Sequence, residues 1–220
     1  MSYQHRFIDG TPAGLPTGKV ICVGRNYADH AAELNNPIPT EPMLFIKPST
    51  SVVDMAQPFV VPQGYGSVHF ETEMSILIGK RLSHASEDEA KAAIAGVGLG
   101  LDLTLRDLQG RLKDKGHPWE KAKGFDGAAP LSVFVAPSEV SDLQNVAIKL
   151  TVNGELRQSG NSSHMLNRVL PLISHSSEFF TLEPGDVILT GTPAGVGPIL
   201  PGDQLQVELA DLLNISTHAT

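Results

Sequence analysis

Several features that would indicate secretion, membrane insertion or nucleic-acid binding are missing from this chain. Its one cysteine, Cys22, has no partner for an internal disulfide and lies in the apolar run KVICVG, as a small buried side chain would. No segment approaches transmembrane length, and the N-terminal MSYQHRFIDG lacks the apolar stretch of a signal peptide. The net charge is −8 with no basic stripe, which argues against nucleic acid. These absences predict a cytoplasmic protein with neither a membrane nor a nucleic-acid partner.

The composition that remains is that of an ordinary globular protein. The chain has 220 residues, of which 41% are hydrophobic and 18% charged, enough to bury a sizeable core. No internal repeat, low-complexity tract or Pro/Gly/Ser-rich linker divides it, so we expect a single domain over residues 1–220. Because the protein is acidic, an acidic substrate would need local positive charge, from a metal ion or from well-placed Lys and Arg side chains.

The pattern of apolar runs and turn residues predicts many short strands and few helices. Strands are expected at 19–24, 43–47, 67–80 and 96–105, in a hairpin around Asn153-Gly154, and on both sides of a Gly/Pro-rich loop within 183–209. Helices are expected at 26–35 with Asn26 as the N-cap, at 86–95 behind a capping box, at 106–115, and around 166–180, where Pro171 opens or kinks the helix. This pattern predicts a strand-dominated α+β fold.

Two glutamates one residue apart, Glu71 and Glu73 in the string HFETE, are the most informative feature. In a strand, residues i and i+2 point to the same face, so the two carboxylates emerge side by side and repel each other. With a third carboxylate they would form the all-oxygen site that Mg²⁺ or Mn²⁺ takes. Asp102, in the otherwise apolar LGLDLTL, is the candidate third ligand. The alternative interpretation is a solvated strand face and an aspartate in a turn or at a sheet edge.

A second group of residues suggests acid–base chemistry. His30 and Glu33 are three residues apart on an expected helix and share a face, so the carboxylate can orient the imidazole as a general base. Two solvated polar residues would give the same spacing. Lys123 lies in an expected loop, where it could face an anionic substrate or a developing enolate oxygen, while Lys121 is expected to be the solvated lysine of the pair. Lys47 and Arg106 are further cationic candidates.

The segment TPAGVG after an expected strand, residues 192–197, is not a nucleotide-binding P-loop, because it lacks the Gly-Lys-Ser/Thr ending. A turn of this kind can nevertheless aim backbone N–H groups and the Thr192 hydroxyl at a carboxylate. A plain connecting turn is the alternative.

Taken together, the motifs resemble the fumarylacetoacetate hydrolase superfamily, in particular its short single-domain members that act on acylpyruvates and oxaloacetate. The resemblance rests on VGRNYADHAAEL, EPMLFIKPST, HFETEMSILIGK, LDLTLRDLQ, PWEKAKGFD, VNGELRQ and LEPGDVILTGTPAGVG in the family's order. It covers residues 19–203, while residues 1–18 form a short extension that carries little of it. The resemblance implies a mixed β-sandwich or β-roll core and a homodimer.

The same resemblance implies roles for individual residues. The metal ligands would be Glu71, Glu73 and Asp102, and the ion Mg²⁺ or Mn²⁺. The catalytic residues would be His30, Glu33 and Lys123. The residues that bind the substrate would be Arg25, Lys47, Arg106, Gln109 and Thr192.

These residues suggest an enzyme that acts on a small 2-oxo acid, and the sequence leaves three functions open. We expect hydrolysis of the C3–C4 bond of acylpyruvates, with oxaloacetate decarboxylation as a further activity. The alternative is an isomerase, decarboxylase or oxaloacetate tautomerase acting on dioic 2-oxo acids. A third interpretation, a metal-dependent organic-acid binding protein without catalysis, is disfavoured because such a protein would not need both His30 and Glu33.

Overall fold

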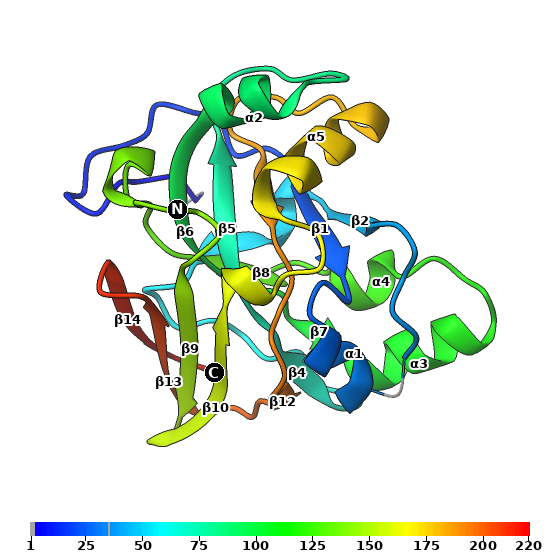
Figure 1. Cartoon of the computed structure of the whole chain (residues 1–220). Helices are drawn as coiled ribbons and strands as arrows, with labels where there is room; N and C mark the ends of the chain where they lie inside the picture. The colour runs from blue at the N-terminus through cyan, green and yellow to red at the C-terminus, as the bar shows by residue number, and fades with distance from the viewer. Residues whose placement is uncertain (1–2, 35) are drawn as a thin grey trace.

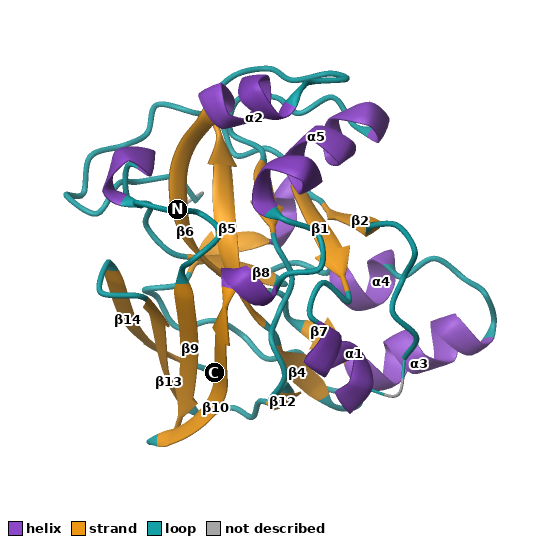
Figure 2. Ribbon diagram, in the orientation of Figure 1, coloured by secondary structure: helices purple, strands orange, loops and turns teal. Residues whose placement is uncertain are grey.

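Strands dominate the computed structural model, which describes residues 3–34 and 36–220 (Figures 1 and 2). The strands are β1 Val20–Gly24, β2 Met43–Lys47, β3 Val52–Asp54, β4 Val68–Phe70, β5 Thr72–Ile78, β6 Ile94–Leu101, β7 Thr104–Leu105, β8 Ala129–Leu131, β9 Ala147–Val152, β10 Glu155–Asn161, β11 Val187–Leu189, β12 Gly197–Pro198, β13 Gln204–Leu209 and β14 Leu213–His218. The helices are α1 Ala28–Glu33, α2 Glu87–Ala93, α3 Arg106–Asp114, α4 Glu120–Lys123 and α5 Val169–Phe179. The strand-dominated α+β class predicted from the sequence is confirmed.

The strands form three sheets. Seven of them run in the order β2-β1-β11-β5-β6-β8-β3, four in the order β10-β9-β13-β14, and three in the order β12-β4-β7. Helices α2 and α5 lie side by side beyond one end of β5 and β6, whereas α1, α3 and α4 gather near the small sheet (Figure 1). None of the helices in the described ranges is long and apolar enough to cross a membrane.

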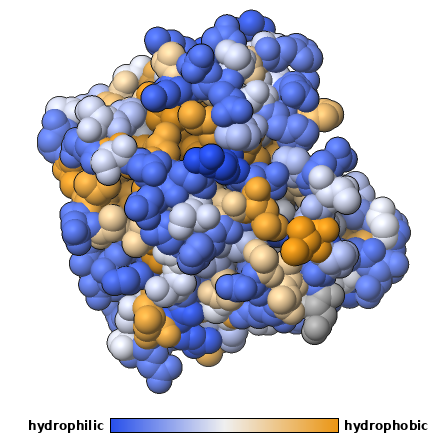
Figure 3. All heavy atoms as spheres, in the orientation of Figure 1, coloured by the Kyte–Doolittle hydropathy of each residue, from blue (hydrophilic) through white to orange (hydrophobic). Residues whose placement is uncertain are grey.

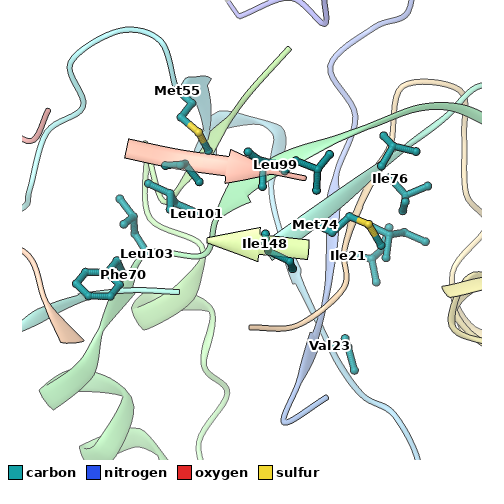
Figure 4. Close-up of a cluster of buried hydrophobic side chains, with 14 of the residues drawn as sticks. Ile21, Val23, Met55, Phe70, Met74, Ile76, Leu99, Leu101, Leu103 and Ile148 are labelled. Atoms are coloured by element: carbon teal, nitrogen blue, oxygen red, sulfur yellow. The ribbon is translucent and has the colours of Figure 1, made fainter. Parts of the chain in front are cut away.

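The core lies between the seven-stranded and four-stranded sheets. Met74 on β5, Leu99 on β6 and Ile148 on β9 point into one cluster (Figure 4), and all three are at most 1% exposed. Every residue of β5 is buried, because the opposite face packs against a second cluster that includes Cys22 and is covered by the N-terminal segment. The expected burial of Cys22 is therefore confirmed, and the site described below is built on a strand with no solvent-exposed face.

Two of the predicted strands are interrupted at residues that carry carboxylates. The strand expected over 67–80 is divided into β4 and β5 at Glu71, and the strand expected over 96–105 is divided into β6 and β7 after Leu101. The register does not slip, because Val68 faces Leu105 on one side of the break and Thr72 faces Leu101 on the other. Counting inward from both sides, Glu71 faces Asp102, whose N–H donates to the Glu71 carbonyl at 2.8 Å.

Most helix starts and turns lie where the sequence predicts them. The Ser86 capping box and the Asn153-Gly154 hairpin turn are confirmed, the latter with positive φ at both residues. Pro171 lies in the first turn of α5 and therefore opens that helix. The helix ends at Phe179, which is 65% exposed.

The N-cap predicted for the first helix is wrong. Helix α1 starts only after Tyr27, and the buried Asn26 side chain instead bonds to Asn167 and to the Thr190 carbonyl, which anchors the chain just before α1. The last residue of the helix expected over 26–35 lies outside the described residues. The homodimer stays a prediction.

Candidate metal centre and active site

Three buried carboxylates lie together at the break between two antiparallel strand pairs, β4 with β7 and β5 with β6. Glu71, Glu73 and Asp102 each offer an oxygen within 4.8 Å of the others, and their side chains lie in residues at most 5% exposed. The geometry follows from the strands: Glu71 and Glu73 share a face because they are two residues apart, and Asp102 faces Glu71 across the pair. The convergence predicted from the sequence is therefore present.

Cations surround two of these carboxylates. The Lys123 ammonium donates to Glu71 Oε2 at 2.8 Å, Asp102 Oδ2 at 2.6 Å and Thr104 Oγ1 at 2.7 Å, and the Arg106 guanidinium donates to the other Glu71 oxygen. Burial works against ionisation of Glu71, but the charges of Lys123 and Arg106 prevail and hold its pKa well below the ordinary value. Burial likewise opposes the charge of Lys123, yet Asp102 and Glu71 raise its pKa. Both groups are therefore ionised at neutral pH.

The structure corrects the predicted environment of Lys123. The residue ends the short helix α4 rather than lying in a loop, and its side chain is buried. Lys121, two residues earlier, is exposed, as expected.

Lys47 does not take the substrate-binding position expected for it. Its side chain is fully buried behind Asp102 and lies outside the cavity described below. The ammonium donates to the carbonyls of Leu103 at 3.3 Å, Ala128 at 3.0 Å and Lys123, and it lies 2.7 Å from Asp102 Oδ1. Lys47 therefore holds the strand break and the end of α4 together, and it supplies a counter-charge to Asp102.

Glu73 is the carboxylate of the three that no cation pairs with in the described ranges. Its Oε2 accepts a hydrogen bond of 2.6 Å from the Gly191 N–H. Burial and the neighbouring charges of Asp102 and Glu71 raise the pKa of Glu73 well above the ordinary value. The donor set fits a divalent cation, because all three groups are hard oxygen ligands and Glu73 lacks a counter-charge within the described ranges.

The loop after β11 must have glycine where it approaches these groups. Gly191 has φ +94°, and a Cβ there would lie 2.6 Å from Asn26 Cβ. Gly195 has φ +98°, and its Cβ would lie 1.9 Å from the Arg157 carbonyl oxygen. Both N–H groups reach site carboxylates, Gly191 that of Glu73 and Gly195 that of Glu33. The N–H groups of this loop thus bind carboxylates of the protein itself, and binding of a substrate carboxylate by residues 192–197 stays a prediction.

His30 and Glu33 lie together on α1, as the spacing predicts. His30 Nδ1 is 3.4 Å from Glu33 Oε2, and the two Glu33 oxygens are 3.0 and 3.2 Å from the Gly195 nitrogen, whose N–H they share. His30 is 5% exposed and lines the cavity, whereas Glu33 is not among the residues that line it. The Gly195 contact fixes Glu33, which in turn orients the imidazole.

These residues enclose a cavity of about 40 Å³. Its lining includes the three carboxylates together with His30, Arg25, Arg106, Gln109, Lys123 and Thr192. A water molecule needs roughly 10–15 Å³ by the same measure, so this arrangement accommodates only a small ligand. All the predicted site residues other than Lys47 and Glu33 therefore contact one cavity.

Thr192 is held by the scaffold on its cavity wall. Its hydroxyl donates to the Thr72 carbonyl at 2.9 Å and accepts from Gln158 Nε2 at 2.7 Å. Gln158, which the sequence analysis did not single out, also accepts the Thr72 N–H. The hydroxyl proton is therefore engaged within the protein and is not directed at a substrate carboxylate.

Lys113 and Trp119, which were not predicted from the sequence, also line this cavity. The sequence pattern could have identified Lys113. The spacing i, i+3 and i+7 places Arg106, Gln109 and Lys113 on one face of α3. On this face Arg106 Nη1 donates to Gln109 Oε1 at 2.8 Å.

Comparison with known proteins defines the class. The fumarylacetoacetate (FAA) hydrolase C-terminal family matches residues 19–218, and the chain belongs to this family. It is 51% identical over 206 residues to the oxaloacetate tautomerase of Escherichia coli (strain K12), covering 93% of this chain and 94% of that protein. It is 44% identical to the mitochondrial oxaloacetate tautomerase of Bos taurus, covering 89% of each chain.

A solved structure of the family shares the fold and contains a metal ion. The fumarylpyruvate hydrolase from Pseudomonas aeruginosa, in complex with Mn²⁺ and pyruvate, matches with a TM-score of 0.93 and 34% identity, over 100% of this chain and 96% of that chain. The FAA hydrolase type of fold expected from the sequence is therefore confirmed.

The role of Lys47 can be tested through stability. Replacing Lys47 by Met should lower the free energy of unfolding by about 3–5 kcal/mol, because the change leaves Asp102 Oδ1 and three buried carbonyls without the Lys47 ammonium. Urea unfolding of the metal-free protein measures this difference. Lys121→Met, at an exposed position on α4, is the matched control and should change stability by less than about 0.5 kcal/mol. Equal stability of Lys47→Met and wild type would show that these contacts contribute nothing.

The raised pKa of Glu73 predicts that metal binding releases a proton. Below that pKa the metal-free protein holds Glu73 protonated, whereas a ligating carboxylate must be ionised, so the affinity for Mg²⁺ should rise with pH through this range. Calorimetry in two buffers with different ionisation enthalpies counts the released protons. Identical heats in both buffers, with an affinity that does not change with pH, would contradict the assignment of Glu73 as the protonated ligand.

Proposed function

We propose that this protein is a metal-dependent oxaloacetate tautomerase, which interconverts the keto and enol forms of oxaloacetate. The observation that carries the proposal is the buried carboxylate triad at a small, cation-lined cavity, in a chain 51% identical to an oxaloacetate tautomerase over nearly its full length. This activity is the alternative that the sequence predicts. The comparisons support it better than acylpyruvate hydrolysis, because the hydrolase is the more distant relative, at 34% identity.

Glu71, Glu73 and Asp102 are the residues that would hold the metal ion. A bound Mg²⁺ or Mn²⁺ would supply Lewis-acid stabilisation of the negative charge that develops on the substrate's C2 oxygen. Mn²⁺ is present in the fumarylpyruvate hydrolase structure, which supports a divalent ion here without choosing between the two. We assign the same class of ion to this chain.

The protein's own residues supply positioning and proton transfer. The buried ammonium of Lys123 adds positive charge beside the triad, where enolate charge develops. Arg106, oriented by Glu71 and Gln109, presents its guanidinium to the cavity, which suits a substrate carboxylate. We assign to His30, oriented by Glu33, the proton transfer between C3 and the C2 oxygen: in forming the enol the imidazole takes the proton from C3 and gives a proton to the oxygen, and in forming the keto form it does the reverse.

Hydrolysis of the C3–C4 bond of acylpyruvates is the second candidate. The His30–Glu33 pair favours it, because an imidazole oriented by a carboxylate can equally activate a water molecule, and the fumarylpyruvate hydrolase shares the fold. Decarboxylation of oxaloacetate would use the same enolate without water. The non-catalytic binding protein has no support, since the relatives named above are enzymes. The expected cytoplasmic location stays a prediction, and the relative from Bos taurus is mitochondrial.

The activity can be tested directly. Adding protein and Mg²⁺ to the enol form of oxaloacetate should speed the loss of the enol's ultraviolet absorbance well beyond the uncatalysed rate, and excess EDTA should abolish the effect. A coupled lactate dehydrogenase assay for pyruvate separates tautomerisation from decarboxylation and from cleavage of acetylpyruvate. Faster release of pyruvate from acetylpyruvate than conversion of the enol would replace tautomerisation by hydrolysis as the main function.

The assignment of His30 predicts a selective loss. His30→Ala should reduce turnover by roughly 10²–10⁴-fold, the usual contribution of a positioned base, and leave metal affinity nearly unchanged. The chain offers a matched control in His175, which faces Glu178 with the same i, i+3 spacing on α5, outside the cavity lining. His175→Ala should retain wild-type turnover. A His30→Ala enzyme that works at the wild-type rate would remove His30 from the mechanism.

A further inference from the structure

Four cationic side chains line the cavity. Two of them have no role in the mechanism proposed above: Lys113, and Arg25, for which the resemblance implies only substrate binding in general. Arg106 and Lys123 pair with the site carboxylates. Arg25 and Lys113 line the cavity as well, but neither forms an ion pair with a carboxylate within residues 3–34 and 36–220. Two unpaired cations facing one small cavity repel each other and their neighbours, so an anion placed between them would be stabilised.

Lys113 is held in position by its surroundings. It lies on the face of α3 that also carries Arg106 and Gln109, and its ammonium is 5.5 Å from the centre of the Trp119 ring. Burial, and then the positive charges of Arg25, Arg106 and Lys123, lower the pKa of Lys113. The lysine is only partly buried, so it lies closer to solvent than the triad. This environment favours an anion as its missing partner.

Arg25 approaches the cavity from the end of β1. Its backbone has φ 58°, a left-handed conformation that is uncommon for residues other than glycine and is often found where a side chain serves a site. Its one side-chain hydrogen bond within the described ranges is a long one, 3.4 Å from Nη1 to the Pro37 carbonyl. The fork of the guanidinium therefore retains donors that suit a carboxylate.

We propose that Lys113 and Arg25 form a second anion subsite, which binds the substrate carboxylate farther from the metal ligands and so selects dicarboxylic over monocarboxylic 2-oxo acids. The inference rests on the proposed function, which provides a four-carbon dicarboxylate. The three acidic ligands would repel the second carboxylate, whereas these two cations attract it, and the substrate thereby takes one orientation. Lys113 and Arg25 are in this sense specificity-determining residues.

Binding of two stable analogues tests the subsite without turnover. Malate and 2-hydroxybutyrate share a 2-hydroxy acid that can chelate the metal, but 2-hydroxybutyrate has a methyl group where malate has its second carboxylate. In calorimetric titrations with saturating Mg²⁺, the wild type should bind malate about tenfold or more tightly than 2-hydroxybutyrate, as expected for charge-assisted hydrogen bonds. Equal affinity of the wild type for the two acids, including failure of malate to bind, would overturn the proposal.

Variants assign the preference to the two residues. Lys113→Gln, and separately Arg25→Asn, which tolerates the left-handed backbone, should each weaken malate binding about tenfold and change 2-hydroxybutyrate binding by less than about twofold. Lys115→Gln, at an exposed lysine beyond the same end of α3 and outside the cavity lining, is the matched control and should leave both affinities unchanged. Equal weakening of both acids, or of neither, would show that the pair does not recognise the second carboxylate.

The same variants separate this inference from the proposed function. If the enzyme tautomerises oxaloacetate, Lys113→Gln should raise KM for oxaloacetate with kcat nearly unchanged, because the lost contact is the same in ground and transition states. If the wild type shows no tautomerase activity but keeps the tenfold preference for malate, the proposed function fails and the subsite stands. If it tautomerises oxaloacetate without that preference, the subsite alone fails.

Discussion

Repulsion among three carboxylates that share one buried corner is the constraint on which the rest of the structure depends. Glu71, Glu73 and Asp102 lie within 4.8 Å of one another, where water cannot screen their charges. Lys47, Lys123 and Arg106 neutralise Asp102 and Glu71, which leaves Glu73 without a cation. A divalent ion would supply the missing charge, so the repulsion in the metal-free corner would favour metal binding.

The backbone around this corner brings together segments that are far apart in the sequence. Cross-strand pairing sets Asp102 opposite Glu71, and the positive-φ glycines at 191 and 195 let the loop after β11 bond to Glu73 and to Glu33. One loop therefore connects Glu73 to the His30–Glu33 pair on the separate helix α1. Most of the face seen in the space-filling view is hydrophilic, with apolar residues gathered in smaller groups (Figure 3).

The sequence predicted contacts between residues close together in the chain better than contacts between residues far apart in it. The i+2 and i+3 spacings within one element predicted that Glu71 lies beside Glu73 and that His30 lies beside Glu33. Asp102 was a candidate, but its position opposite Glu71 depends on strand register, which no local pattern specifies. Lys47 was assigned to the substrate as a cationic candidate. Its actual contacts to Leu103, Lys123 and Ala128 could not be predicted, because these residues lie far from it in the chain. Lys113 was overlooked although the period of α3 placed it on the face of Arg106.

The central claim is that the three carboxylates form one metal centre. The most direct test is a crystal structure of the protein grown with Mn²⁺ and oxalate, in which anomalous scattering locates the ion. We expect one strong peak bonded to oxygens of Glu71, Glu73 and Asp102 at about 2.0–2.3 Å, with oxalate on the cavity side. A peak elsewhere, or a Lys123 ammonium that remains between Glu71 and Asp102 with no ion on Glu73, would contradict the claim.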